Sequence, residues 1–383
     1  MAVENGRGGE ISSMELAAAL QKYYKVTFVH TNLFTGKGLL SNEAIKKKLK
    51  NVKISARIKF ATLNLSNKLF SFPLPNQILK IYRMVSKNNI VYISYSDIKT
   101  TLMFLLFNLV KRQGKLIIGY RKPLHSDKLF SLYNIKYRCS ILLLSLFTKR
   151  IYHHALSLNA KKFLDKFYSP EKVVHIVHGI DLEKYTEEKK EKSTNILKFV
   201  YIGYFDDIHK GLGILLKAID LFIRINENVE VSFEFCGMGP LEKNVRDLEM
   251  KYPKYVHYHG YINNDLIHNY YKKGDVFLFS SRVEPFPRAI MEALAAKLII
   301  LSSKTIGSVE LLKGRKFAFF IEELKPKIIC KKLLELYNLW KTNLEEFKFL
   351  QNLAKEYVFK NFSSAKEIDM FRNLINRIVY NNS

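Results

Sequence analysis

The sequence predicts an α/β protein of two domains, each a twisted parallel sheet with helices on both faces. Its 383 residues, 48% of them hydrophobic, are enough for two separate cores. Within residues 197–340, short apolar runs rich in strand formers alternate regularly with helical patterns. The charge is also divided between two halves. Residues 1–180 hold 30 Lys and Arg against 8 Asp and Glu, whereas residues 181–383 hold 32 against 27.

The first half predicts a less regular order of elements. Gly8 and Gly9 precede a helix expected over residues 11–23, and glycines ahead of a helix let backbone N–H groups approach an anion. No strand is evident before them, so the first strand is either vestigial or lies upstream. Strands are expected over residues 26–30, 90–94 and 116–119, helices over residues 77–85, 100–111 and 133–150, and residues 157–158 and 173–177 close this half. His125 follows the strand at 116–119 among basic residues.

The basic first half predicts an anionic partner, which is nucleic acid, an anionic membrane surface or a phosphate-bearing substrate. Residues 41–57, with Lys46-Lys47-Lys48, suit a solvated helix face or a membrane-facing patch. Residues 133–150 suit a core helix first and a membrane-associated helix second. The apolar runs at 102–110 and 141–147 are too short to span a bilayer, and no signal peptide is expected. The 3 widely spaced cysteines favour a reducing compartment and predict no disulfide framework.

The second half predicts a regular doubly wound domain. A stretch of mixed charge at 187–192 suits a linker. Strands are expected over residues 197–203, 230–236, 256–259, 275–280, 298–302 and 317–321, and helices over residues 211–225, 241–250, 265–271, 288–296, 307–312 and 328–340. Residues 363–380 predict a last amphipathic helix with a capping box from Ser364 to Glu367. The expected domains are therefore residues 1–178 and 179–362, with the helix of residues 363–383 packing back on the first.

Two carboxylates mark the centre of the second domain. Glu284 falls in the turn after the strand at 275–280, where open α/β sheets bind ligands, and Glu292 lies about one turn into the next helix. A helix N-terminus between two carboxylates suits a sugar, diphosphate and ribose in a row, the layout of a nucleotide sugar. Lys210, after the strand at 197–203, is placed to meet a phosphate. The alternative is a buried helix whose glutamates only offset its dipole.

Several motifs in the second half resemble the retaining glycosyltransferases of family 4 (glycosyl transferases group 1). They are His178-Gly179-Ile180-Asp181 at the domain junction, Gly203 through Lys210-Gly211, Gly237-Met238-Gly239-Pro240-Leu241, His259-Gly260-Tyr261-Ile262, the pair Glu284 and Glu292, and Gly307 with Glu310. Gly8-Gly9-Glu10 resembles a Gly-Gly-x-Glu loop of the family. The resemblance implies the GT-B fold, two facing Rossmann-like domains with the active site in the interdomain cleft. The first domain would then bind the acceptor and the second the nucleotide sugar.

The resemblance also implies roles for single residues. Glu284 would contact the hydroxyls of the donor sugar, Lys210 would neutralise the leaving diphosphate, and His125 corresponds to a histidine near the reacting sugar. Glu292 would bind the ribose, and the remaining donor-binding positions are Gly8, Gly9, Gly203, Gly237, Tyr261, Ile262, Phe286 and Arg288. No Asp-x-Asp motif occurs, so no metal and no cofactor are expected. Two positions depart from the family's motifs, Tyr204 in place of an arginine and Pro287 in place of a glycine.

The expected function is transfer of a hexose, with retention, from a nucleotide diphosphate sugar to a membrane-held, lipid-linked glycan in the assembly of a surface glycan or glycoprotein glycan. The basic first half would hold the protein on the anionic inner face of the cell membrane, from the cytoplasmic side. The alternatives are a glycogen- or sucrose-type synthase with a free acceptor and a non-catalytic family member. A nucleic-acid-binding protein is disfavoured, because it leaves the glutamate pair and the glycine turns unexplained.

Overall fold

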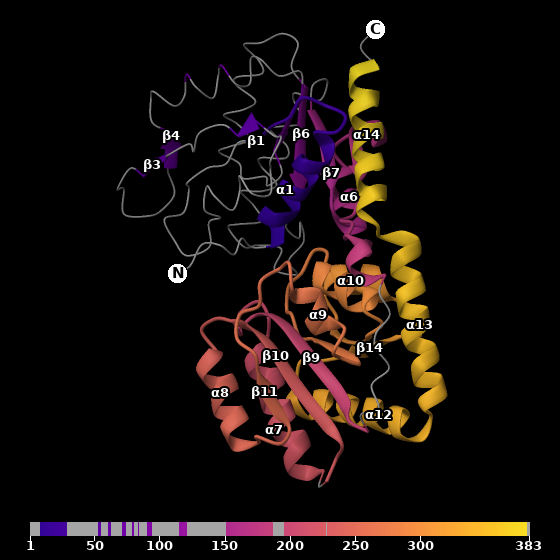
Figure 1. The fold of residues 1–383 in the computed structure, drawn as a ribbon. Helices are drawn as coiled ribbons and strands as arrows, with labels where there is room; N and C mark the ends of the chain where they lie inside the picture. Colours follow the sequence, from indigo (N-terminus) through magenta and orange to yellow (C-terminus); the bar gives the residue numbers. More distant parts are fainter. Residues whose placement is uncertain are drawn as a thin grey trace. The chain divides into compact units, whose positions relative to one another are not determined.

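The computed structural model divides the chain into two compact units, residues 1–176 with 367–383, and residues 177–366. It describes residues 8–28, 53–54, 60–62, 71–73, 79, 83, 90–93, 115–120, 151–186, 195–226 and 228–380. Figure 1 shows both units, with the described helices and strands labelled. The assignment of acceptor and donor to the two units stays a prediction.

The described core of the first unit is a four-stranded parallel sheet in the order β5-β6-β7-β8. Its strands are β5 (Ile90–Ile93), β6 (Lys115–Tyr120), β7 (Ile151–Ala155) and β8 (Val173–His175). Alternate residues of β6 point to opposite faces, as the pleat requires. Leu116, Ile118 and Tyr120 share one cluster with helix α6 (Leu158–Leu164). Ile117 belongs to the opposite cluster, with α1 (Gly8–Leu20) and α14 (Ser364–Tyr380).

The structure corrects several expectations for this half. Helix α1 begins at Gly8, so Gly8 and Gly9 lie in its first turn and not in a loop ahead of it. The strands expected at 90–94 and 116–119 are confirmed, whereas β7 and α6 were not expected. Four short strands form two further pairs. Strand β1 (Thr27–Phe28) pairs with β2 (Lys53–Ile54), and β3 (Phe60–Thr62) pairs with β4 (Ser71–Pro73). His125, residues 100–111 and 133–150, and most of residues 41–57 and 77–85 lie outside the described residues.

The second unit is a six-stranded, all-parallel sheet, and its strands confirm the predicted doubly wound pattern. In spatial order the strands are β11 (Val256–Tyr258), β10 (Val231–Met238), β9 (Leu197–Tyr204), β12 (Val276–Phe279), β13 (Ile299–Ser303) and β14 (Ala318–Ile321). The helices are α7 (Leu212–Ile225), α8 (Glu242–Lys251), α9 (Ile267–Tyr271), α10 (Arg288–Ala295), α11 (Ile306–Leu312), α12 (Pro326–Thr342) and α13 (Leu344–Asn361).

The helices of this unit pack as two groups. Helix α7 packs against both α8 and α12, whereas α10 packs against α9 and α13. The chain leaves β9 toward β10 on one side and leaves β12 toward β13 on the other. The neighbouring strands β9 and β12 therefore form the topological switch point of the sheet. Ligands of open α/β sheets bind at this point, outside the carboxyl ends of the strands.

The two segments at the edge of this unit, residues 178–181 and 362–364, pair with each other. The N–H of Ile180 donates to the carbonyl of Phe362 at 3.0 Å, and the N–H of Ser364 donates to the carbonyl of Ile180 at 2.9 Å. Gly179 is needed here, because a Cβ on it would lie 2.4 Å from the carbonyl oxygen of Ser363. Helix α13 was not expected. The cap of α14 is Ser363 and not Ser364, because its Oγ accepts from the N–H of Lys366 at 3.3 Å.

Candidate functional site

The loop after β9 is braced from both sides at the switch point. Gly211, the N-cap of α7, has a φ of +60°, and a Cβ on it would lie 2.4 Å from the carbonyl oxygen of Ser280. Asp207 accepts a hydrogen bond from the N–H of Gly213 at 3.0 Å and so closes the first turn of α7. The Ser280 hydroxyl, at the end of β12, donates to the carbonyl of Lys210 at 2.8 Å. These contacts fix the backbone at Lys210.

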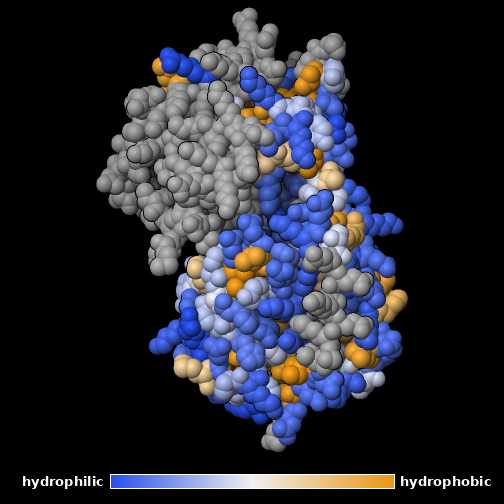
Figure 2. Space-filling model, in the orientation of Figure 1, coloured by the Kyte–Doolittle hydropathy of each residue, from blue (hydrophilic) through white to orange (hydrophobic). Residues whose placement is uncertain are grey.

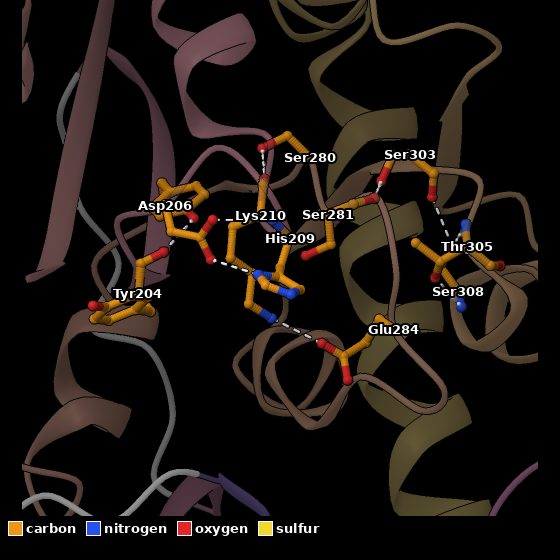
Figure 3. Close-up of polar contacts among 11 residues, drawn as sticks. Tyr204, Asp206, His209, Lys210, Ser280, Ser281, Glu284, Ser303, Thr305 and Ser308 are labelled. Atoms are coloured by element: carbon orange, nitrogen blue, oxygen red, sulfur yellow. Dashed lines mark hydrogen bonds and ion pairs between the residues drawn. The ribbon is translucent and has the colours of Figure 1, made fainter. Parts of the chain in front are cut away.

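Lys210 and Glu284, which lie 74 residues apart, form an ion pair across the switch point (Figure 3). The Lys210 ammonium donates to Glu284 Oε2 at 2.8 Å, and both side chains are partly buried. Lys210 comes from the loop after β9 and Glu284 from the loop after β12. The structure thus places a cation and a carboxylate in contact where the topology favours ligand binding. Such a pair offers one group for phosphate oxygens and one for sugar hydroxyls.

A network of hydroxyl groups holds the Glu284 loop from the side of β13. Ser303 donates to the carbonyl of Ser281 at 2.5 Å, and Ser308 donates to the carbonyl of Ser303 at 2.7 Å. Thr305 and Ser308 form a capping box at the start of α11. The N–H of Gly307, inside this helix, donates to the carbonyl of Glu284 at 3.0 Å. Figure 3 shows this network beside the ion pair.

Replacing Thr305 by alanine removes the oxygen that accepts from the Ser308 N–H at 3.0 Å. We expect the second unit to lose about 1 kcal/mol of its free energy of unfolding, the ordinary cost of losing a helix N-cap. The corresponding fall in melting temperature is about 2–4 °C for a unit of this size. Differential scanning calorimetry measures it. Thr305→Ser keeps the oxygen and is the matched control, so equal losses in the two variants would contradict the role of the cap.

Glu292, on α10, interacts with three side chains of the same unit. The Arg288 guanidinium lies 3.9 Å from Glu292 Oε1, one helical turn away. The buried Tyr271, at the end of α9, hydrogen-bonds to Glu292, and Tyr185 lies within its electrostatic reach. Burial first, and then the Glu292 charge, raise the pKa of both phenols well above the usual range. Both phenols are therefore neutral donors at any physiological pH.

The ends of β9 and β10 approach each other so closely that glycine is needed on one of them. Gly237 pairs with Gly203 in the sheet and has a φ of +152°. A Cβ on Gly237 would lie 1.9 Å from the Gly203 carbonyl oxygen, so this position does not accept a side chain. A Cβ on Gly203 would meet its nearest atom, the Tyr201 hydroxyl oxygen, at 3.6 Å, an ordinary contact. Packing within the described residues therefore does not explain the glycine at 203.

The turn after β11 carries the two residues expected to frame a base, Tyr261 and Ile262. The side chain of Tyr261 is 38% exposed, and the turn is tied to β10 by the N–H of Gly237, which donates to the Gly260 carbonyl at 2.8 Å. His259 lies 2.5 Å from Glu234 Oε2. Burial acts to raise the pKa of Glu234, but the hydrogen bonds from His259 and Ser232 outweigh burial and lower the pKa to about 2.

The structure therefore brings some of the predicted residues together and leaves others apart. Lys210 and Glu284 are in contact, and Arg288 faces Glu292 at the start of α10. Phe286 has a buried side chain that packs against Phe362, so a donor role for it is restricted to its backbone. The remaining predicted residues are placed on other elements or lie outside the description: Gly8 and Gly9 in α1, Tyr261 and Ile262 after β11, and His125 outside the described residues.

Sequence reasoning missed the residues that hold the predicted ones in place. Tyr185, Tyr271 and Ser280 were not singled out. A tyrosine at the end of a short helix gives no sign that it faces a carboxylate in a later helix. The hydroxyl run from Ser302 to Ser308 did carry a signal, because Ser and Thr just after a strand are typical of a helix cap.

Three general properties of the described residues bear on the site. Among the described residues, no group of three or more His, Cys, Asp or Glu side chains is placed to hold a metal ion. No helix in the described ranges has the length and apolar character needed to cross a membrane. In the view of Figure 2, the described surface is mostly hydrophilic, with small and separate apolar patches.

Comparison with known proteins gives a family match for the second unit. Residues 197–338 match the family model described as glycosyl transferases group 1. The capsular polysaccharide biosynthesis glycosyltransferase CapH of Staphylococcus aureus is 25% identical over 68% of this chain and 71% of its own length. A glycogen synthase of Thermodesulfovibrio yellowstonii is 25% identical over 55% of this chain. The chain spans only 44% of the length of that enzyme.

Solved structures match the whole chain. Anabaena Alr3699/HepE, solved with UDP and glucose, superposes with a TM-score of 0.72 over 98% of both chains at 14% identity. The lipopolysaccharide outer core galactosyltransferase WaaB gives a TM-score of 0.66 over all of this chain and 98% of its own, at 13% identity. At this level of identity the likeness shows the fold alone. That fold is GT-B, as the sequence predicted.

Proposed function

Because this chain is of the glycosyl transferases group 1 type and has the GT-B fold, we propose that it transfers a sugar from a nucleotide diphosphate donor. The observation that carries the proposal is the Lys210–Glu284 pair at the switch point of the second sheet. Glu292, held by Arg288 and Tyr271 on the next helix, supplies the second carboxylate.

In this proposal each group of the site has one task. Lys210 leaves Glu284 to neutralise the diphosphate, and Glu284 then accepts hydrogen bonds from hydroxyls of the donor sugar. Glu292 accepts hydrogen bonds from the ribose, and the base stacks at the turn of Tyr261 and Ile262. The N-terminus of α10, at Arg288, adds its partial positive charge beside the diphosphate. Pro287 caps this helix without a side-chain hydrogen bond.

The chemistry asks mainly for charge stabilisation at the leaving diphosphate. Breaking the bond between the sugar and the diphosphate transfers negative charge onto the phosphate oxygens, and a fixed ammonium stabilises that charge without reorganisation. Lys210 takes the place that a divalent ion has in metal-dependent enzymes. We propose that the transfer retains the anomeric configuration, with the leaving phosphate accepting the acceptor's proton, and that activity persists in EDTA.

The proposed acceptor is a membrane-held, lipid-linked glycan, and the proposed sugar is a hexose. The proposal is supported by the net positive charge of residues 1–180 and by relatives whose names place them in capsular polysaccharide and colanic acid biosynthesis. The protein would then lie on the inner face of the membrane through anionic lipid. Binding to vesicles of phosphatidylglycerol should be strong at low salt and fall with salt. Equal binding to neutral vesicles would refute this part of the proposal.

A free acceptor is the second candidate, because one relative is a glycogen synthase. One assay with radiolabelled donor distinguishes the two proposed acceptors. Incorporation into a chloroform-extractable product favours the lipid-linked acceptor, and incorporation into added glycogen favours the free one.

The donor site is tested first by thermal shift with UDP, GDP, ADP and their common sugar conjugates. A ligand at 100 times its dissociation constant adds about 2.7 kcal/mol to the free energy of unfolding, which gives a visible shift. We expect one nucleotide family to stabilise the wild type. Glu292→Ala should lose that shift, because the ribose loses its acceptor. Glu335→Ala, on the exposed side of α12, is the matched control and should keep it. If no nucleotide stabilises the folded wild type, the donor proposal is wrong.

A further inference from the structure

The cations nearest the proposed diphosphate position are already engaged with carboxylates. Lys210 contacts Glu284 at 2.8 Å. Arg282 is turned to the side, with its Nε donating to the carbonyl of Asp207 at 3.0 Å and its NH2 lying 3.5 Å from Asp207 Oδ2. Tyr204, at the end of β9, is exposed and supplies no cationic group. A nucleotide sugar brings two negative charges, so this loop needs more positive charge than Lys210 alone supplies.

His209 is the histidine of this loop, and Asp206 holds it twice. The N–H of His209 donates to Asp206 Oδ1 at 3.0 Å, and the imidazole Nδ1 lies 3.2 Å from Asp206 Oδ2. The carbonyl of His209 accepts from the N–H of Arg282 at 2.7 Å. The backbone and one edge of the ring are therefore both fixed. The side chain remains 68% exposed, with Nε2 on the edge of the ring away from Nδ1.

Figure 3 shows the side chains of His209 and Lys210 extending from the loop toward Glu284. The two residues are adjacent in the chain, and the Ser280 and Arg282 contacts fix their backbone from the side of β12. An imidazolium held in this way would add a second positive charge beside the ammonium of Lys210. It would also add an N–H donor that can reach a phosphate oxygen.

We propose that His209, tethered by Asp206, is a second diphosphate-binding residue whose protonated form strengthens donor binding. The inference rests on the proposed donor site and deepens it, because it makes donor affinity depend on pH within the range in which imidazoles titrate. Donor binding is then tightest where the imidazole is charged, and it weakens as the pH rises and the charge is lost.

Asp206 is the anionic neighbour of His209. Burial acts to raise the pKa of Asp206, but hydrogen bonds from the backbone and ring of His209 outweigh burial and lower that pKa, so Asp206 stays ionised. The other charged groups of the two loops form pairs of opposite sign, Lys210 with Glu284 and Arg282 with Asp207. The two opposite charges within each pair nearly cancel each other at a distance. Asp206 is therefore the carboxylate in direct contact with the imidazole.

The test is isothermal titration calorimetry with UDP-glucose, GDP-mannose and ADP-glucose at pH 5.5 and pH 8.5. Each diphosphate is esterified at both ends and keeps two negative charges across this range, so a change in affinity reports on the protein. We expect the wild type to bind one of them about tenfold more tightly at the lower pH, the size of one charge-assisted hydrogen bond at an exposed site.

Three variants separate the imidazole charge from other causes. His209→Gln should bind at both pH values with the affinity that the wild type shows at pH 8.5. His209→Lys carries a permanent charge and should bind tightly at both. His257→Gln, on β11 and outside this loop, is the matched control and should keep the dependence of the wild type on pH.

The outcomes distinguish this proposal from the donor site itself. If the wild type binds a nucleotide sugar with equal affinity at both pH values, or if His209→Gln matches it at pH 5.5, the role of His209 is wrong and the donor site stands. A dependence on pH that persists in His209→Lys also overturns the role of His209. If the wild type binds none of the three ligands at either pH, the donor site fails and this inference fails with it.

Discussion

Lys210→Ala is expected to lower kcat by about 100- to 1,000-fold, the usual loss when one group that stabilises developing charge is removed. The ammonium, held 2.8 Å from Glu284, is the group proposed to neutralise the leaving diphosphate. Because the charge grows as the bond to the sugar breaks, most of the loss should appear in kcat and less in KM. Steady-state kinetics with the donor found by thermal shift measure both.

Lys210→Arg is the control for this prediction. It keeps the charge but not the compact geometry of the ammonium, so it should recover part of the lost rate. The melting temperature of both variants should stay close to that of the wild type, because the pair is partly exposed. A Lys210→Ala variant that keeps wild-type kcat would exclude Lys210 from the reaction.

Glu284→Gln is expected to change catalysis and product binding in opposite directions. The amide is a poorer acceptor for sugar hydroxyls, so kcat/KM for the donor should fall by about 100-fold or more, the loss of a contact to a charged group. The nucleoside diphosphate product lacks the transferred sugar and so makes no contact that the substitution at Glu284 would remove. Its affinity should rise, because Lys210 no longer has an anionic partner to leave. Kinetics with the donor test the expected fall in kcat/KM, and calorimetry with the nucleoside diphosphate tests the expected rise in its affinity.

The double variant Lys210→Ala/Glu284→Gln completes the cycle. Groups in direct contact couple, so the combined loss of rate should be smaller than the product of the two single losses. A combined loss of rate equal to the product of the two single losses would show that the two side chains act in separate steps. Loss of nucleoside diphosphate affinity in Glu284→Gln alone would contradict the competition between Glu284 and phosphate for Lys210.

The second unit was predictable because local and tertiary signals agree there. Its strands are buried on both faces and read as short continuous apolar runs, and α7 buries residues at helical spacing. The same regularity placed Lys210 and Glu284 after β9 and β12. Their contact follows from strand order, which the sequence alone does not state but the resemblance implied. Helix α13 was missed although Phe347, Leu350, Ala354 and Val358 recur at helical spacing.

The first unit was harder to predict for physical reasons. The strand β7 contains two histidines that are fully buried, His153 and His154, and polar residues in a short run weaken a strand signal. Distant partners hydrogen-bond to both rings, although His153 Nε2 has no hydrogen-bond partner among the described residues. The Tyr120 hydroxyl bonds to His153 Nδ1, and His154 Nε2 donates to the carbonyl of Ile176 at 2.7 Å. The start of α1 was placed too late because glycine is a poor helix former, yet it is tolerated in a first turn.

The Lys210–Glu284 pair also bears on product release. A donor that brings both phosphate and sugar gives each member of the pair a new partner. A bare phosphate, a nucleoside triphosphate or the spent nucleoside diphosphate occupies only the lysine and leaves the carboxylate to compete for it. In the proposed mechanism, the pair would therefore favour the complete substrate over the many simpler anions of a cell. Once the sugar has gone, the returning carboxylate would help to expel the spent nucleotide and ready the site for the next donor.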